Sequence, residues 1–170
     1  PEPIHCEISG QTPILAMGSD LKNAFAMNKG SEVLVGPHIG DLQNASTHAT
    51  LEWTIDRYEK LFSIQPEKII VDSHPQFFSS HLGERIGKSS QISVIPVQHH
   101  HAHIASVMAE HNLEGPVLGI AMDGTGYGPD GTVWGGEFLL CKGNQYHRLA
   151  HIHEAPLPGG EKAVSEPWRQ

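Results

Sequence analysis

The feature of this sequence with the clearest chemical potential is a cluster of histidines. Four of the chain's 13 histidines fall within five consecutive positions: His99, His100, His101 and His103. An apolar run at residues 92–97 leads into the cluster, and a helical pattern continues over residues 102–111. Residues four apart share one face of a helix, so His99 and His103 are expected to point the same way. This is the spacing at which two imidazoles bind one metal ion. The alternative is a solvated polar patch at a helix start.

The ligands that complete such a metal site must come from elsewhere in the chain. The pattern is not the zinc-protease motif His-Glu-x-x-His, because His100 stands where the general base Glu is required. Two histidines do not fill a coordination shell, and carboxylates combine with imidazoles to bind iron, manganese or zinc. Asp123 is the candidate third ligand, since it follows an apolar strand at residues 117–122, where open α/β sheets place their ligands. The alternative is an Asp that begins an ordinary Asp-Gly turn.

Composition excludes several classes of protein. A chain of 170 residues with 38% hydrophobic residues, 18 Gly and 12 Pro fits one or at most two turn-rich globular domains. No apolar run approaches the roughly 20 residues that span a bilayer, and a net charge of −8 argues against binding nucleic acid through its phosphates. Cys6 and Cys141 form no Cys-x-x-Cys pair. They could form one disulfide, but a reduced, cytoplasmic setting is the plainer expectation.

The elements that must position the histidines follow an order that begins twice. The hydrophobic pattern predicts an antiparallel meander of three strands at residues 13–17, 23–27 and 32–35. A helix follows, with Asn44 or Ser46 as its cap and with these apolar residues on one face: Leu51, Ile55, Tyr58 and Phe62. Next come a strand at 68–71 that ends at Asp72, a helix at 77–86 closed by Gly87, a strand at 92–97, and the histidine helix, which runs to Asn112. The order then restarts with strands at 117–122, 132–141 and 145–152 and a helix that opens at residue 161.

This order predicts an α/β protein with the ribonuclease-H-like plan. That plan is a mixed sheet with flanking helices, doubled as in the actin-like superfamily that includes sugar kinases and Hsp70. Residues 1–114 are expected to form one complete lobe, and residues 115–170 the start of a second lobe. In such a pair, the first hairpin of each lobe holds nucleotide phosphates between the lobes.

Both first hairpins carry suitable turns. Lys22 and Asn23 lie in the first one, where Lys22 could neutralise an anion. The second contains Gly124, Thr125 and Gly126, whose small residues let backbone N–H groups approach a phosphate or an oxyanion closely. Taken alone, either turn also fits an ordinary hairpin, because Gly and Asp favour turns in any case.

The linked motifs of the chain resemble one known family. They are Gly18-Ser19-Asp20-Leu21-Lys22-Asn23, His38-Ile39-Gly40-Asp41-Leu42, Gln98-His99-His100-His101-Ala102-His103, Asp123-Gly124-Thr125-Gly126-Tyr127-Gly128, Trp134-Gly135-Gly136-Glu137, Leu157-Pro158-Gly159-Gly160 and Pro167-Trp168-Arg169. Together they cover nearly the whole chain, and their order is similar to that in the HypF family of hydrogenase-maturation carbamoyltransferases. The resemblance implies a fold similar to that of the tRNA threonylcarbamoyl-transferases.

The resemblance also implies an activity. The family makes carbamoyl-adenylate from carbamoyl phosphate and ATP in another domain, and this domain transfers the carbamoyl group to the C-terminal cysteine of the partner HypE. Dehydration then yields the cyanide ligands of the nickel–iron hydrogenase centre. The family's divalent metal site, expected to hold Fe or Zn, maps to His99, His103 and Asp123, with a further Asp late in the second lobe.

The family's chemistry gives roles to the remaining motif residues. The metal would polarise a carbamoyl or phosphate oxygen, and backbone donors of the Gly124–Gly126 turn would stabilise the developing oxyanion. Lys22 would bind the adenylate phosphate, and His100 or His101 would assist thiol deprotonation. Asn23, Gly135 and Gly136 join the expected cofactor-binding set.

The departures from the family leave three hypotheses open. The signatures of the family's other domains and most of the second lobe do not occur in the sequence, so we expect a fragment that does not catalyse transfer alone. The first hypothesis is carbamoyl transfer to a protein thiol. The second is O-carbamoyl transfer to a small molecule, as in antibiotic and nodulation-factor synthesis. The third is a metal-binding or docking module without catalysis. An acceptor assay separates the first two, and retained metal without nucleotide binding favours the third.

Overall fold

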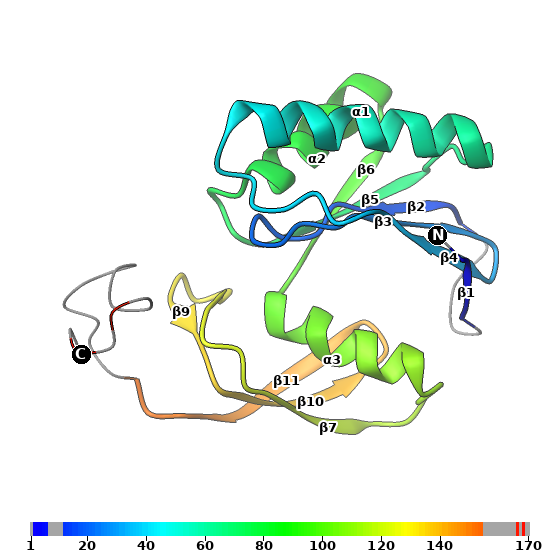
Figure 1. Cartoon of the computed structure of the whole chain (residues 1–170). Helices are drawn as coiled ribbons and strands as arrows, with labels where there is room; N and C mark the ends of the chain where they lie inside the picture. The colour runs from blue at the N-terminus through cyan, green and yellow to red at the C-terminus, as the bar shows by residue number, and fades with distance from the viewer. Residues whose placement is uncertain (1, 7–11, 155–165, 167, 169–170) are drawn as a thin grey trace.

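The computed structural model describes residues 2–6, 12–154, 166 and 168. It forms an α/β structure in which one sheet carries two helices and a second sheet lies below it with one helix on the side that faces the first sheet (Figure 1). The helix predicted to open at residue 161 lies outside the described residues. Among the described residues, no helix is both long and apolar enough to cross a bilayer.

The first sheet has the predicted meander at its centre. Its strands are β1 (Ile4–His5), β2 (Ile14–Ala16), β3 (Ala26–Lys29), β4 (Glu32–Val35), β5 (Lys68–Asp72) and β6 (Ser93–Val97). They lie in the order β1-β4-β3-β2-β5-β6, with β2, β3 and β4 antiparallel and β5 and β6 parallel to β2. Helices α1 (Ala45–Phe62) and α2 (Phe78–Ser90) cover one face of this sheet (Figure 1). The predicted fold class is thereby confirmed; β1, only two residues long, was not predicted.

Helix α1 begins where the sequence predicts. Asn44 caps it, because its Oδ1 accepts hydrogen bonds from the backbone N–H groups of Ser46 and Thr47, both at 3.1 Å. Such a side chain satisfies donors that have no partner within the first turn. Leu51 and Ile55 lie one turn apart and are buried against the sheet, as the helical spacing of the apolar residues predicts.

Helix α2 is longer than predicted, since Gly87 does not end it. The helix continues to Ser90, and Gln91 adopts the left-handed conformation after it, with φ 57°. Gly87 instead marks a close approach between helix and strand: a Cβ atom there would lie 2.3 Å from Cγ2 of Val94 and 2.9 Å from the carbonyl oxygen of Ile92. The glycine is therefore required by packing and not by backbone conformation.

Replacing Gly87 by Ala is expected to destabilise the chain by up to about 2 kcal/mol. Helix propensity alone would favour Ala by roughly 1 kcal/mol, but the added methyl group meets Val94 and overpacking of this kind costs about 1–3 kcal/mol. Urea unfolding measures the difference. Gly115→Ala is the control, because a Cβ at Gly115 meets nothing within 4 Å. A Gly87→Ala chain more stable than the wild type would contradict the packing argument.

The second sheet contains β7 (Val117–Ala121), β10 (Glu137–Lys142) and β11 (Gln145–His151) in the order β11-β10-β7, all antiparallel. The predicted strand at residues 132–141 is divided in two. Its first part, β9 (Val133–Trp134), pairs with β8 (Gly126–Tyr127) as a small separate ribbon. The break falls at Gly136, which has φ 67° and donates its N–H to the carbonyl of Asp123.

The histidine helix α3 (His99–Glu110) packs on the second sheet (Figure 1). Its Ile104 and Met108 join the buried cluster of Ala121, Trp134, Leu139 and Cys141. Gly119 permits this contact, because a Cβ there would lie 2.4 Å from Ile104 Cδ1. The division at residue 114 stays a prediction, but it assigns to the first lobe a helix whose buried side chains belong to the core of the second sheet.

Candidate metal centre

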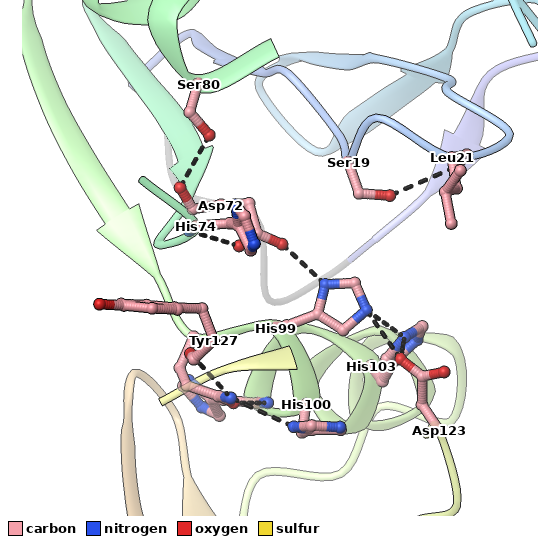
Figure 2. Close-up of polar contacts among 12 residues, drawn as sticks. Ser19, Leu21, Asp72, His74, Ser80, His99, His100, His103, Asp123 and Tyr127 are labelled. Atoms are coloured by element: carbon pink, nitrogen blue, oxygen red, sulfur yellow. Dashed lines mark hydrogen bonds and ion pairs between the residues drawn. The ribbon is translucent and has the colours of Figure 1, made fainter. Parts of the chain in front are cut away.

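The two histidines four positions apart meet Asp123 at the start of α3. The helix begins directly after β6, with Gln98 as its cap: Oε1 of Gln98 accepts the N–H of His101 at 2.9 Å. Nε2 of His99 lies 2.9 Å from Oδ2 of Asp123, and Nε2 of His103 lies 3.6 Å from the same oxygen (Figure 2). The two Nε2 atoms are 3.1 Å apart. The predicted convergence of His99, His103 and Asp123 is therefore present in the structure.

This donor set fits a divalent metal ion. One nitrogen from each imidazole and one carboxylate oxygen all lie within 4.8 Å of one another. Ligand atoms bound tetrahedrally to zinc at about 2.1 Å lie about 3.4 Å from each other, and the three atoms here are 2.9, 3.1 and 3.6 Å apart. Two imidazoles and a carboxylate suit zinc or iron. Three protein ligands also leave a coordination position open, as catalytic centres require.

The turn after β7 fixes the Asp123 carboxylate. Its Oδ1 accepts the N–H of Gly124 at 2.9 Å, which directs Oδ2 toward the histidines. The backbone carbonyl of Asp123 accepts the N–H of Gly136 at 3.1 Å. The side chain is 40% exposed and so remains accessible to a ligand.

Asp72 is a site residue that sequence reasoning did not assign. Its Oδ2 accepts the Nδ1–H of His99 at 2.7 Å, on the side of the ring opposite Asp123 (Figure 2). The Asp72 side chain is only 7% exposed. It ends β5, beside Val97 at the end of β6. The signal that could have found it is the one that selected Asp123, namely an Asp at the end of a buried strand.

The surroundings of His99 and His100 shift the pKa values of these two neighbouring imidazoles in opposite directions. The hydrogen bond to Asp72, followed by the charges of Asp72 and Asp123, raises the pKa of His99 above its ordinary value, although burial opposes this. Burial lowers the pKa of His100, and the charge of His99 adds to that effect. Negative charge is thus concentrated around His99, where a bound cation would be stabilised.

The structure places His100 and His101 away from the metal-ligand atoms. His100 is fully buried; Nε2 of Gln98 donates to its Nδ1 at 3.2 Å, and its own Nε2 has no hydrogen-bond partner among the described residues. His101 is 6% exposed, with its Nε2 3.2 Å from the carbonyl oxygen of Gly143. Both rings therefore anchor the start of α3 in the core. Their part in thiol deprotonation stays a prediction.

The first hairpin turn is held by its own side chains. Asn23 is 1% exposed, and its Nδ2 donates to the carbonyl oxygens of Met17 at 2.9 Å and Ser19 at 2.7 Å. Lys22 has φ 49°, and its N–H donates to Oδ1 of Asp41 at 2.7 Å, while its side chain is exposed. The exposed ammonium of Lys22 remains available to an anion. The NH2 group of Asn23 is occupied within the loop, whereas its buried Oδ1 has no hydrogen-bond partner among the described residues. The cofactor-binding role of Asn23 stays a prediction.

Asp20 in the same turn caps α2 from a distance. Its two carboxylate oxygens accept the N–H groups of Phe78 at 2.7 Å and Ser79 at 2.9 Å. A helix N-terminus attracts anions, and here a side chain of the chain itself takes that position. The turn is thereby fixed to the first helix that follows β5.

Close packing explains three of the predicted glycines, Gly126, Gly135 and Gly136, but not Gly124, where a Cβ would meet nothing within 4 Å. A Cβ at Gly135 would lie 2.4 Å from the carbonyl oxygen of Gly124, and one at Gly136 would lie 2.5 Å from Ile152. At Gly126 a Cβ would lie 2.7 Å from Cε1 of His100 and 2.9 Å from Cβ of His99. The predicted role of these glycines in binding a cofactor stays a prediction. Gly126 lets the turn approach the histidine helix, Gly135 lets the chain approach Gly124, and Gly136 makes room for Ile152.

We expect Gly126→Ala to weaken zinc binding by the chain about tenfold or more. The new methyl group would displace His99 and His100 at the start of α3, and displaced ligands or their supports typically cost 10–100-fold in metal affinity. Competition with a chromophoric chelator measures the affinity. Gly115→Ala, with open space around its Cβ, serves as the control. Unchanged affinity in Gly126→Ala would show that the turn does not position the ligands.

Comparisons with known proteins agree with these observations. The family model described as the HypF Kae1-like domain matches residues 9–110, and that of the carbamoyltransferase Kae1-like domain, second subdomain, matches residues 119–170. The carbamoyltransferase HypF2 of Cupriavidus necator is 43% identical over 92% of this chain and 19% of its own length. The carbamoyltransferase HypF of Synechocystis is 42% identical over 99% of this chain and 22% of its own length.

Solved structures show the same relationship. The crystal structure of full-length HypF in the phosphate- and nucleotide-bound form matches 99% of this chain and 26% of that chain, with 46% identity and a TM-score of 0.91. The chain thus spans about a fifth to a quarter of the length of these relatives. The match covers both sheets and the histidine helix between them, and by its sequence and its fold the chain belongs to the HypF Kae1-like domain family.

Proposed function

We propose that this chain supplies the metal centre at which a HypF carbamoyltransferase transfers a carbamoyl group from carbamoyl-adenylate to the C-terminal cysteine of HypE. The transfer would serve synthesis of the cyanide ligands of the nickel–iron hydrogenase centre. The observation that carries the proposal is the convergence of His99, His103 and Asp123 in a family whose curated relatives are named carbamoyltransferases. The phosphate- and nucleotide-bound relative supports an adenylate substrate.

The proposed reaction is a simple group transfer. The cysteine sulfur attacks the carbamoyl carbon, the bond between that carbon and the phosphate oxygen breaks, and AMP leaves with the electron pair while the thiol proton is released. His99, His103 and Asp123 would hold the metal ion. When bound, that ion acts as a Lewis acid on an oxygen of the substrate.

Other residues of the chain would bind and orient the adenylate. The exposed Lys22 carries a positive charge that neutralises its phosphate. The exposed turn at Gly124 and Thr125 also presents the backbone N–H of Thr125, which would donate to a developing oxyanion, whereas the N–H of Gly124 already donates to Oδ1 of Asp123. Asp72, through His99, would keep the ligand nitrogen directed toward the metal position.

A chimera tests this function. The chain replaces the matching segment of Synechocystis HypF, and carbamoyl transfer from carbamoyl phosphate and ATP is measured by the mass of HypE. We expect transfer to the HypE thiol, and its loss in the chimera that carries His103→Ala. The matched control is His111→Ala, because His111 caps the C-terminal end of the same helix, away from the cluster. Transfer that survives His103→Ala would overturn the metal role.

The acceptor is tested in the same chimera. A sugar hydroxyl offered in place of HypE should receive no carbamoyl group. Transfer to the sugar, with none to HypE, would replace thiol transfer by O-carbamoyl transfer to a small molecule.

A further inference from the structure

We infer that Asp72 is a positioning residue that decides which nitrogen of His99 carries the proton, so that Nε2 presents a lone pair to the metal ion. The inference rests on the proposed metal centre but concerns a residue outside its ligand set. It stands on the two different hydrogen bonds that the Asp72 carboxylate accepts.

The first of these bonds fixes the tautomer of His99. An ionised carboxylate only accepts hydrogen bonds, so the 2.7 Å contact between Asp72 Oδ2 and His99 Nδ1 places the proton on Nδ1. Nε2 of the neutral ring then carries a lone pair. That lone pair faces the Asp123 carboxylate and His103 Nε2, at 2.9 and 3.1 Å.

The second bond fixes the carboxylate itself. Oδ1 of Asp72 accepts the backbone N–H of His74 at 2.8 Å. The hydroxyl of Ser80 donates to the backbone carbonyl of Asp72 at 2.8 Å, which ties the end of β5 to α2. With 7% of the side chain exposed, water offers little competition for either oxygen. Asp72 is therefore held by the first sheet, whereas His99 belongs to the helix that packs on the second sheet.

Asp123 competes with Asp72 for the proton of His99 and is the weaker acceptor. Asp123 lies 2.9 Å from His99 Nε2 and its side chain is 40% exposed, whereas Asp72 lies 2.7 Å from Nδ1 and is 7% exposed. Hydrogen bonds to charged groups are stronger when short and shielded from water. The single proton of the neutral ring should therefore stay on the Asp72 side.

This geometry predicts that Asp72→Asn weakens zinc binding more than Asp72→Ala does. In Asp72→Asn, the amide oxygen must still accept the His74 N–H, so the NH2 group faces His99. An NH2 group only donates, so Nδ1 becomes the acceptor and the proton moves to Nε2, which loses its lone pair. Asp72→Ala leaves a small cavity but lets His99 adopt either tautomer. A residue that acted through packing alone would give the reverse order, because Asn keeps the shape of Asp.

The test is zinc affinity of the chain by chelator competition. We expect Asp72→Asn to bind zinc about 100-fold more weakly than the wild type, and Asp72→Ala about tenfold more weakly, within the range known for residues that support metal ligands. Asp56→Asn, which makes the same change in an exposed pair with Lys60, should leave the affinity unchanged. The inference would be overturned if Asp72→Asn bound zinc as tightly as the wild type, or if Asp72→Asn lost less zinc affinity than Asp72→Ala.

A second measurement separates this inference from the proposed function. Long-range proton–nitrogen NMR spectra of the metal-free wild-type chain, recorded under alkaline conditions, identify the protonated nitrogen of His99. A proton on Nδ1 supports the role of Asp72 even if the chain binds no zinc and the proposed metal centre fails. A proton on Nε2 overturns the inference even if zinc binds.

Discussion

His103→Ala and Asp123→Ala are each expected to reduce the zinc or iron affinity of the chain at least about 100-fold. Each removes one of the three atoms that converge within 4.8 Å. The two ligands that remain are an imidazole and a carboxylate in His103→Ala and two imidazoles in Asp123→Ala, and neither pair fills the coordination shell of a divalent ion. Metal content after loading and dialysis, measured by mass spectrometry, should fall from about one equivalent to near zero.

The matched control for these variants is His111→Ala. His111 caps the far end of α3, so its removal takes a histidine from the same helix without touching the cluster. Equal metal content in the wild type, His103→Ala and Asp123→Ala would contradict the account. The histidines would then be a polar cluster at a helix start.

The second large effect concerns stability: Arg148→Met should cost about 3–5 kcal/mol in the free energy of unfolding. The Glu137 side chain is completely buried, and Arg148 donates to both of its oxygens, at 2.6 and 2.8 Å. The guanidinium also lies 4.1 Å from the centre of the Trp134 ring. Without Arg148, the Glu137 carboxylate would remain buried without its partner, which is the costly way to break such a pair.

A double variant gives this prediction its control. Glu137→Leu with Arg148→Met removes both charges, and urea unfolding should show a smaller loss than Arg148→Met alone. A loss below about 1 kcal/mol in Arg148→Met would show that the pair contributes no more than an exposed ion pair.

The pair of Glu137 and Arg148 also supports the metal site. Glu137 accepts the N–H of Gly135, and Gly135 packs against Gly124, whose N–H holds Asp123.

The sequence predicts those parts of the molecule that depend on local periodicity. Leu51 and Ile55 mark the buried face of α1, and His99 and His103 mark one face of α3, because each pair repeats with the period of a helix. Asn44, one of the two predicted caps, is the residue that caps α1. Asp123 could be selected because it follows an apolar strand. The same rule applied to Asp72 would have found the fourth member of the cluster.

The remaining features depend on contacts between segments far apart in the chain. Gly87 resembles a helix end in sequence, but its neighbour Val94 is reached only when α2 lies on β6. Asp20 caps α2 across 58 residues. His100 and His101 resemble their functional neighbours, and only the packing of α3 on the second sheet shows that they are buried. Local patterns carry no information about such approaches.

X-ray absorption at the zinc edge of the zinc-loaded chain tests the central claim most directly. The account predicts nitrogen and oxygen ligands at about 2.0–2.1 Å, with the scattering pattern of two imidazoles. Cys6 and Cys141 are both buried and belong to no part of the site, so no sulfur ligand is expected. Sulfur at about 2.3 Å, or a spectrum without imidazole scattering, would contradict a metal centre built from His99, His103 and Asp123.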